Sequence, residues 1–217
     1  MKLVRWIMTI LTRVLSISSL TIAAHAQVPF QNLPKVMDAS MSRDQQISIA
    51  LSAGPEEVAN KATVYVLGPK GYEKAREGMN GASCLVGRHF VKPTETTIEP
   101  MCYDPEGSRT LLIVDLYAEE LRSRGTSEGE IKADIAKGYK ESRFKAPSKP
   151  GVLYMLSSDN RLGPTPESGT AHVPPHFMFY APYMTGKDLG FAAVAPFLTK
   201  PGEPDAKIVV FADPNLK

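Results

Sequence analysis

The stretch Asn80-Gly81-Ala82-Ser83-Cys84, followed later by Pro100-Met101-Cys102-Tyr103-Asp104-Pro105, decides how this chain is predicted to fold. It holds both cysteines of the 217-residue sequence and marks the change from a strand-rich half to a helix-rich half. Asn80-Gly81 is the preferred centre of a type I′ hairpin, because both positions need a positive φ. The sequence therefore predicts a three-stranded antiparallel meander over residues 62–88.

Residues 1–26 have the composition of a secretory signal peptide. Three basic residues lead into an apolar run over 14–22, and Ala24-His25-Ala26 forms an A-x-A cleavage site. The whole apolar stretch after Arg13 has about a dozen residues, whereas a membrane-spanning helix needs roughly 20, so an uncleaved anchor is the weaker interpretation. We expect cleavage after Ala26 and a soluble mature protein in the periplasm or outside the cell, with one domain over 27–217.

The net charge of the mature chain argues against two classes of partner. The whole chain carries +2, and the signal peptide carries three cations and no acid, so the mature chain has a net charge of −1. A near-neutral chain without a cluster of lysines and arginines offers no electrostatic footprint for nucleic acid or an anionic membrane. Neither is expected as a partner. The sequence leaves an unidentified ligand or protein as the partner, and it leaves the oligomeric state open.

The two cysteines, Cys84 and Cys102, are predicted to form a disulfide. An even count of cysteines in an exported protein favours pairing, because the compartments outside the cytoplasm are oxidising. The bridge would close a loop of about 19 residues and stabilise the fold by roughly 3 kcal/mol through the entropy of the unfolded chain. Residues 92–108 have the composition of a loop, so the bridge is expected to tie a loop to the strand at 82–87.

Two segments predict helices with recognisable caps. Residues 42–53 begin with a capping serine, and residues 127–143 begin with the capping box Ser127-Glu128-Gly129-Glu130. Residues 108–124 fit either a helix or a strand that runs into a short helix. The apolar spacing is helical, but Ile113-Val114 is β-branched, and periodicity alone does not separate the two.

The order of elements predicts the fold class. Later strands are predicted at 152–156, 172–181 and 207–212, and residues 159–169 have the composition of a polar loop. Strands, then helices, then strands indicate an α+β fold. We predict a single domain in which an antiparallel β-sheet packs against a helical hairpin plus an N-terminal helix.

Two histidines in a late strand, His172 and His176, are candidates for a ligand site. Four residues apart on an extended chain, they share one face, and Met178 shares it with His176. Imidazole with thioether is a soft donor set that suits copper in an exported protein, and Met101 and Met184 could join it. The competing interpretation has histidines that hydrogen-bond to loops and a methionine that fills the core. This second interpretation is the one we favour, so no metal is predicted.

The acidic residues do not predict a catalytic pair. They are scattered along the chain, and Glu119-Glu120 has the pattern of a solvated helix face. No G-x-G-x-x-G, G-x-x-x-x-G-K-[ST] or G-x-S-x-G motif occurs, so nucleotide binding and a nucleophile elbow have no support. No catalytic residue and no cofactor is predicted. The acids considered are Asp104, Asp115, Glu119, Glu120 and Asp159.

Aromatic residues are concentrated late in the chain. They could line a groove for an apolar or peptide ligand, but core packing is the favoured interpretation. The set is Phe177, Phe179, Tyr180, Tyr183 and Phe191.

The hexapeptide Ser83-Cys84-Leu85-Val86-Gly87-Arg88 resembles the S/T-H-G-C-hydrophobic-R signature of L,D-transpeptidases, which crosslink peptidoglycan. The resemblance implies a nucleophilic Cys84, which would need a base such as His89 to take its proton. The chain departs from the signature, because Ala82-Ser83 stands where the family has His-Gly. A cysteine-dependent cell-wall enzyme is therefore an alternative to the disulfide.

Four short motifs resemble a group of uncharacterised exported bacterial proteins. They are Asn80-Gly81-x-x-Cys84, Pro100-Met101-Cys102-x-Asp104, Tyr154-Met155-Leu156 and Pro175-His176-x-Met178, and the likeness spans most of the mature chain. That group has no assigned activity, so the resemblance implies export and a common fold and adds no mechanism. We predict a non-enzymatic binding or structural domain held by one disulfide. A periplasmic copper-type site and a cysteine-dependent enzyme are the alternatives.

Overall fold

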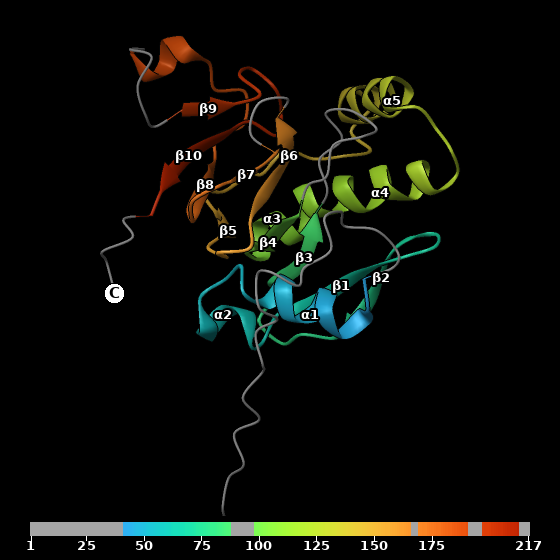
Figure 1. The fold of residues 1–217 in the computed structure, drawn as a ribbon. Coiled ribbons are helices and arrows are strands. Elements are labelled where there is room, and N and C mark those ends of the chain that lie inside the picture. The colour runs from blue at the N-terminus through green and yellow to red at the C-terminus, as the bar shows by residue number, and fades with distance from the viewer. Residues whose placement is uncertain (1–40, 88–97, 166–168, 191–196, 213–217) are drawn as a thin grey trace, which may run out of the picture.

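A computed structural model describes residues 41–87, 98–165, 169–190 and 197–212 of the chain (Figure 1). The predicted signal peptide and its cleavage site lie outside these residues. In the described part, no helix is both long enough and apolar enough to cross a membrane.

The described residues form helices and strands in the following order, with η2 a 3-10 helix: α1 Arg43–Leu51, α2 Glu56–Ala59, β1 Thr63–Gly68, β2 Gly71–Arg76, β3 Ser83–Gly87, β4 Glu99–Tyr103, α3 Pro105–Arg109, α4 Leu111–Ser123, α5 Glu128–Lys140, β5 Val152–Met155, β6 Arg161–Thr165, β7 Gly169–His172, β8 His176–Tyr180, η2 Gly186–Leu189, β9 Phe197–Thr199 and β10 Lys207–Phe211.

Eight strands form one mostly antiparallel sheet in the order β2-β1-β3-β4-β5-β8-β10-β9. Strands β6 and β7 pair with each other in a separate two-stranded sheet. Within the large sheet, β3 and β4 are joined through five residue pairs, whereas β4 and β5 are joined through two. This mixture of helices with a mostly antiparallel sheet agrees with the predicted α+β class.

Helices lie on both faces of the β1–β4 part of the sheet (Figure 1). Successive residues of a strand point to opposite faces, and β3 follows this rule. Cys84 and Val86 belong to a buried cluster with Ile49 of α1, while Leu85 belongs to a second cluster with Leu111 of α4. Helix α4 also lies against β2 and α5. We call the side of the sheet that carries Cys84 the α1 face, and the side that carries Leu85 the α4 face.

The capped helices are confirmed. The Glu130 carboxylate accepts the backbone N–H of Ser127 at 3.1 Å, and the Ser127 side chain accepts the N–H of Glu130 at 3.4 Å, as the capping box predicts. Ser42 and Gln45 form the same arrangement at the start of α1. Residues 111–123 form α4, so the helical alternative is the correct one for that segment.

The predicted meander is wrong at its third strand. β1 and β2 form the expected antiparallel pair, but β3 crosses to the other side of β1 and pairs with it in parallel. Gly78 makes this path possible, because a Cβ there would lie 2.2 Å from the backbone nitrogen of Thr63. The Thr63 N–H donates to the carbonyl oxygen of Ala82 at 2.9 Å, and Asn80 donates to the carbonyl oxygen of Val58 at 2.8 Å. These contacts outweigh the local hairpin preference.

The predicted loop over 92–108 is also wrong in its second half. β4 forms there as an internal strand between β3 and β5. Pro100 argued against a strand here, since proline disfavours a central strand. In β4, however, Pro100 lies beyond the residues that pair with β5. The polar loop predicted at 159–169 likewise contains β6 and the first residue of β7.

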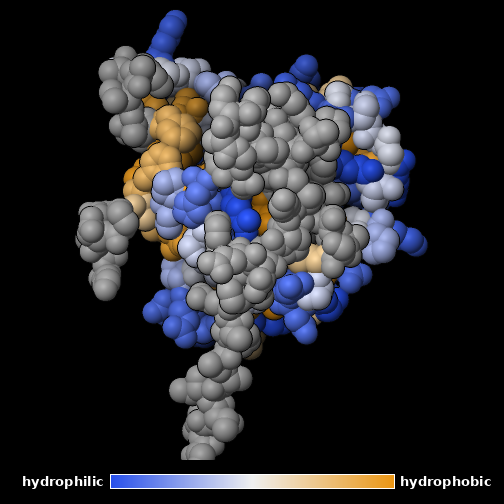
Figure 2. All heavy atoms as spheres, in the orientation of Figure 1, coloured by the Kyte–Doolittle hydropathy of each residue, from blue (hydrophilic) through white to orange (hydrophobic). Residues whose placement is uncertain are grey.

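The β8–β10–β9 end of the sheet carries exposed apolar side chains, which Figure 2 shows gathered at the left of the view. Phe179 and Val210 are exposed on one face, and Phe197 and Phe211 on the other, each by 38–45%. Tyr183 is exposed by 61%. Core packing was therefore the wrong expectation for Phe179 and Tyr183, and it holds for Tyr180, which is buried. Phe191 lies outside the described residues.

Candidate functional site

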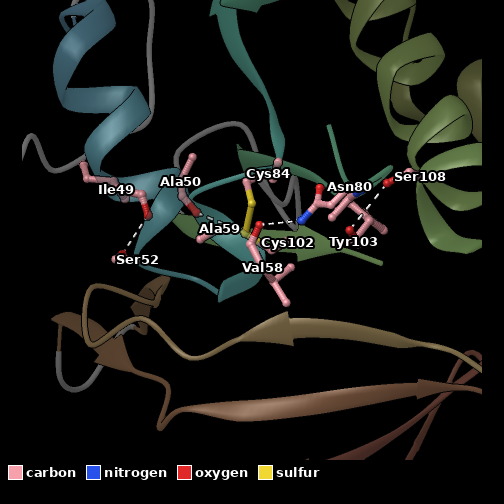
Figure 3. Close-up of a disulfide and its surroundings, with 12 residues drawn as sticks. Ile49, Ala50, Ser52, Val58, Ala59, Asn80, Cys84, Cys102, Tyr103 and Ser108 are labelled. Carbon is pink, nitrogen blue, oxygen red and sulfur yellow. Dashed lines mark hydrogen bonds between the residues drawn. A yellow bond between two sulfur atoms is a disulfide. The ribbon is translucent and has the colours of Figure 1, made fainter. Parts of the chain in front are cut away.

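Cys84 and Cys102 form the predicted disulfide (Figure 3). The two residues are direct neighbours in the β3–β4 register, and both are fully buried. The bridge therefore joins two adjacent strands, whereas the sequence analysis expected it to tie a loop to a strand. Gly54 lets the turn between α1 and α2 lie against it, since a Cβ there would be 3.1 Å from Cys102 Sγ.

The paired sulfur atoms bear on the cysteine-enzyme alternative. A nucleophilic cysteine needs a thiolate that a substrate can reach, and neither bridged, buried sulfur offers one. His89, the base which that reading required, lies outside the described residues. The geometry gives this alternative no support.

The structure separates the two candidate histidines. His172 ends β7 in the small sheet, is exposed, and has its ring Nε2 2.6 Å from the carbonyl oxygen of Ser158. His176 begins β8 in the large sheet, directly after Pro174-Pro175. The predicted shared face therefore fails for His172 and holds for His176 with Met178, which lie two residues apart on one strand.

His176 lies in apolar surroundings. It is 3% exposed, its Nδ1 is 2.8 Å from the carbonyl oxygen of Pro174, and its ring meets that of Phe211 at 5.8 Å between centroids. Burial lowers the pKa of the imidazole, and the contact with Pro174 opposes that shift. The described part of the chain has no group of three His, Cys, Asp or Glu side chains that could hold a metal ion.

A second group of polar side chains lies on the α4 face and was not predicted. Its centre is Asp115 of α4, which accepts a hydrogen bond from the hydroxyl of Tyr103 on β4. The Tyr103 hydroxyl also lies 3.7 Å from the sulfur of Met101. Burial raises the pKa of Asp115, against the opposing effects of the Tyr103 hydrogen bond and the charge of Lys207.

Glu99, at the start of β4, is the second carboxyl group of this site. Burial, and then the charge of Asp115, raises the pKa of Glu99 to about 7, and the charge of Lys207 opposes the shift. A carboxyl group with this pKa changes its charge near neutral pH. Glu99 and Asp115 together form a carboxyl pair, and each carboxyl group has a pKa above its ordinary value.

The basic part of the site comes from β10. Burial lowers the pKa of Lys207, whose Nζ donates to the carbonyl oxygen of Asp205 at 3.2 Å. Lys200 forms an ion pair with the Asp205 side chain. The Lys207 ammonium is thereby held against the turn that precedes β10.

Tyr139 of α5 completes the group. Its hydroxyl is buried and has no hydrogen-bond partner among the described residues. Burial, followed by the charges of Asp205 and Asp115, raises its pKa. The carboxyl cluster is the name used below for five residues: Glu99, Tyr103, Asp115, Tyr139 and Lys207.

Two of the other acids, Asp104 and Glu119, have structural roles. Asp104 caps α3 through the Gly107 N–H and also accepts the Val152 N–H at 3.0 Å. Glu119 is 1% exposed and forms an ion pair with Arg122 at 3.2 Å, so the prediction of a solvated face is wrong for this residue. The turn between β1 and β2 lies against the backbone at this point of α4.

A surface hollow of about 470 Å³ lies between the β1–β2 turn and α4, where Lys70, Tyr72 and Leu116 are among its lining residues. Glu120 and Arg124 also line it and form an ion pair with each other. Both of these side chains are well exposed, so the hollow is a solvated surface and offers no buried charge. The carboxyl cluster is the stronger candidate site.

No family model, curated protein or solved structure matches the chain. The function proposed below therefore depends on the geometry of the site.

Proposed function

We propose that this protein is an exported, non-enzymatic binding domain held by the Cys84–Cys102 disulfide, and that the carboxyl cluster binds a small organic cation. The observation that carries the proposal is the carboxyl pair Glu99 and Asp115, each with a raised pKa, beside the buried Tyr139 hydroxyl, which has no hydrogen-bond partner among the described residues. Export is supported by the disulfide, because such bridges persist mainly in oxidising compartments.

A cation is the ligand that the electrostatics favour. An opposite charge within about 4–6 Å of a carboxyl group stabilises its ionised form. A bound ammonium group would therefore oppose the effects that raise the pKa of Glu99 and Asp115. The Tyr139 hydroxyl could accept a hydrogen bond from the same ammonium group.

The neighbouring apolar side chains favour a cation with an alkyl part. Tyr103 belongs to the buried cluster that also contains Leu85, Leu111 and Met155 on the α4 face. A ligand that places its charged end at Asp115 can lay an apolar part against this cluster. A primary alkylamine has both properties.

The cluster supports binding better than catalysis. Nucleophilic catalysis requires a group whose pKa is lowered or an adjacent base that activates it. The hydroxyl that meets Asp115 belongs to Tyr103, whose pKa is raised well above its ordinary value by burial and by Asp115. This phenol is a poorer acid than in water, and it serves as a hydrogen-bond donor.

Calorimetric titration with hexylamine at pH 6 and pH 8 tests the proposal. Binding should be tighter at pH 8, where Glu99 is ionised, and protons should be released on binding near pH 7. Proton release is measured by repeating the titration in buffers of different ionisation enthalpy. Glu99→Gln should remove the proton release, and Asp115→Asn should weaken binding at least tenfold.

Glu120→Gln is the matched control, because Glu120 is an exposed carboxylate on the same helix as Asp115. This variant should bind hexylamine like the wild type. Affinity that is the same at both pH values and unchanged in Glu99→Gln and Asp115→Asn would refute the proposed site.

A further inference from the structure

Three side chains with soft or neutral donors lie next to one another on the α4 face, and none of them is a member of the carboxyl cluster. His176 of β8 is the register partner of Met155 on β5. Directly opposed residues in an antiparallel pair have Cβ atoms about 4.5–5.5 Å apart. Met178 follows His176 by two residues on the same strand, so it points to the same face. Met155 and Met178 both pack with the apolar cluster on that face.

The hydrogen bonding of His176 leaves one ring nitrogen as a donor to metal. The Pro174 carbonyl oxygen, 2.8 Å from Nδ1, can only accept, so the proton of the neutral ring lies on Nδ1. Nε2 then carries a lone pair. No hydrogen bond joins Nε2 to a described residue, and Nε2 is not one of the fully buried polar atoms that lack a partner. A backbone carbonyl that fixes the ring in this way is the usual companion of a metal-binding histidine.

We propose that Met155, His176 and Met178 form a binding site for one soft monovalent metal ion, Cu(I), held by two thioether sulfur atoms and the Nε2 of the imidazole. Thioether ligands select Cu(I) over the harder divalent ions. The proposed donors carry no charge, so they do not neutralise the charge of the bound ion, which lies in largely buried surroundings. The free-energy cost of burying an ion rises steeply with the charge of the ion, and a monovalent ion is therefore favoured over Zn²⁺ or Cu²⁺.

This site differs from the set that the sequence suggested. His172 is excluded because it lies in the other sheet, and Met155 is added because strand pairing brings it opposite His176. Met101 is left out because its sulfur meets the Tyr103 hydroxyl and its methyl group lies over Gly87, where a Cβ would be 2.2 Å away.

Titration with Ag(I) tests the site by a direct structural readout. Ag(I) has the same charge and softness as Cu(I) and needs no reductant, so the disulfide stays intact. The methionine methyl signals of the mature protein are followed by ¹³C NMR. Those of Met155 and Met178 should shift together and saturate at one equivalent. The signal of Met79, which is 87% exposed, should not follow them.

Competition for Cu(I) with a chromogenic chelator then measures affinity. Met155→Leu and Met178→Leu remove the sulfur while nearly conserving volume, and each should weaken binding at least tenfold, as should His176→Ala. Met79→Leu is the matched control and should bind like the wild type. Thermal unfolding of every variant shows that the fold is kept.

Two results would overturn the proposal. One is a wild-type protein that takes no Cu(I) from the chelator. The other is a folded Met178→Leu or Met155→Leu variant whose affinity stays within twofold of the wild type. Since Glu99 and Asp115 are not ligands here, unchanged Cu(I) binding in Glu99→Gln separates this site from the proposed amine site.

Discussion

Cys84 on β3 lies directly opposite Cys102 on β4, with 4.1 Å between their Cα atoms and both side chains fully buried. The bridge adds a covalent link inside an existing strand pair. Replacing both cysteines by alanine should lower the free energy of unfolding by roughly 3 kcal/mol, through the freedom regained by the unfolded chain. Urea denaturation of the two proteins measures this difference. Alkylation of the urea-denatured protein without reductant should add no mass, and two adducts would contradict the pairing.

Glu99 should make stability depend on pH. The pKa of Glu99 is about 7 in the folded protein, against an ordinary value of 4.5. Between these two pH values the folded protein keeps a proton on Glu99 that the unfolded chain has released. The contribution of this carboxyl group to stability is therefore full below about pH 4.5 and is lost as the pH rises through 7. From pH 5 to pH 8 the wild type should lose more stability than Glu99→Gln. Parallel stability curves for the two proteins would rule out this role of Glu99.

Two glycine substitutions test the path of the chain between β2 and β3. Gly78→Ala should destabilise the protein by about 2 kcal/mol or more, because its Cβ would meet backbone atoms of Ala62 and Thr63 at 2.2–2.4 Å. Gly129→Ala in α5 is the control, since nothing lies within 4 Å of its Cβ position. It should be neutral or stabilising by up to about 1 kcal/mol. Equal melting temperatures for both variants would argue against the crossing.

Adjacent glutamates of α4 should respond differently to substitution. Glu119→Ala removes one partner of a largely buried ion pair and leaves Arg122 with its contact to Glu128. A loss of about 3 kcal/mol is expected. Glu120→Ala removes an exposed carboxylate and should change stability by less than about 0.5 kcal/mol. Chemical denaturation compares the two, and similar small losses would show that Glu119 is solvated.

Export is tested by the mass of the protein recovered from cells. The full chain, expressed in a bacterium with a functional secretion system, should be found in the periplasm or medium with Gln27 as its first residue. Ala26→Arg should block the cleavage and leave the longer chain. A mature-length protein that stays in the cytoplasm would contradict this prediction.

Local signals predicted the elements that local contacts stabilise. Ser127 and Glu130 satisfy each other within one helical turn, so the capping box could be recognised from four residues. Asn80-Gly81 also gave a local signal, but contacts of the segment with Val58 and Thr63 decide its path. A preference of this kind is overruled whenever tertiary contacts offer more.

The carboxyl cluster could not be predicted, because its members meet only through tertiary structure. Asp115 was noted among scattered acids, and Glu99 lay in a stretch that had the composition of a loop. Only the strand β4 and the helix α4 bring the two together. For His176 and Met178, strand periodicity was sufficient, whereas Met155 required the pairing of β5 with β8.

The two residue pairs between β4 and β5 divide the sheet into two leaves. The disulfide and the five-pair β3–β4 ladder lie in one leaf, and the five-pair β8–β10 ladder lies in the other. A strip this narrow should open at a lower free energy than either ladder. The carboxyl cluster draws Glu99 from the first leaf and Lys207 from the second. A ligand that contacts groups from both leaves would hold them together. Its binding should therefore slow amide exchange of the β4–β5 pairs at ligand concentrations that do not yet raise the melting temperature of the whole molecule.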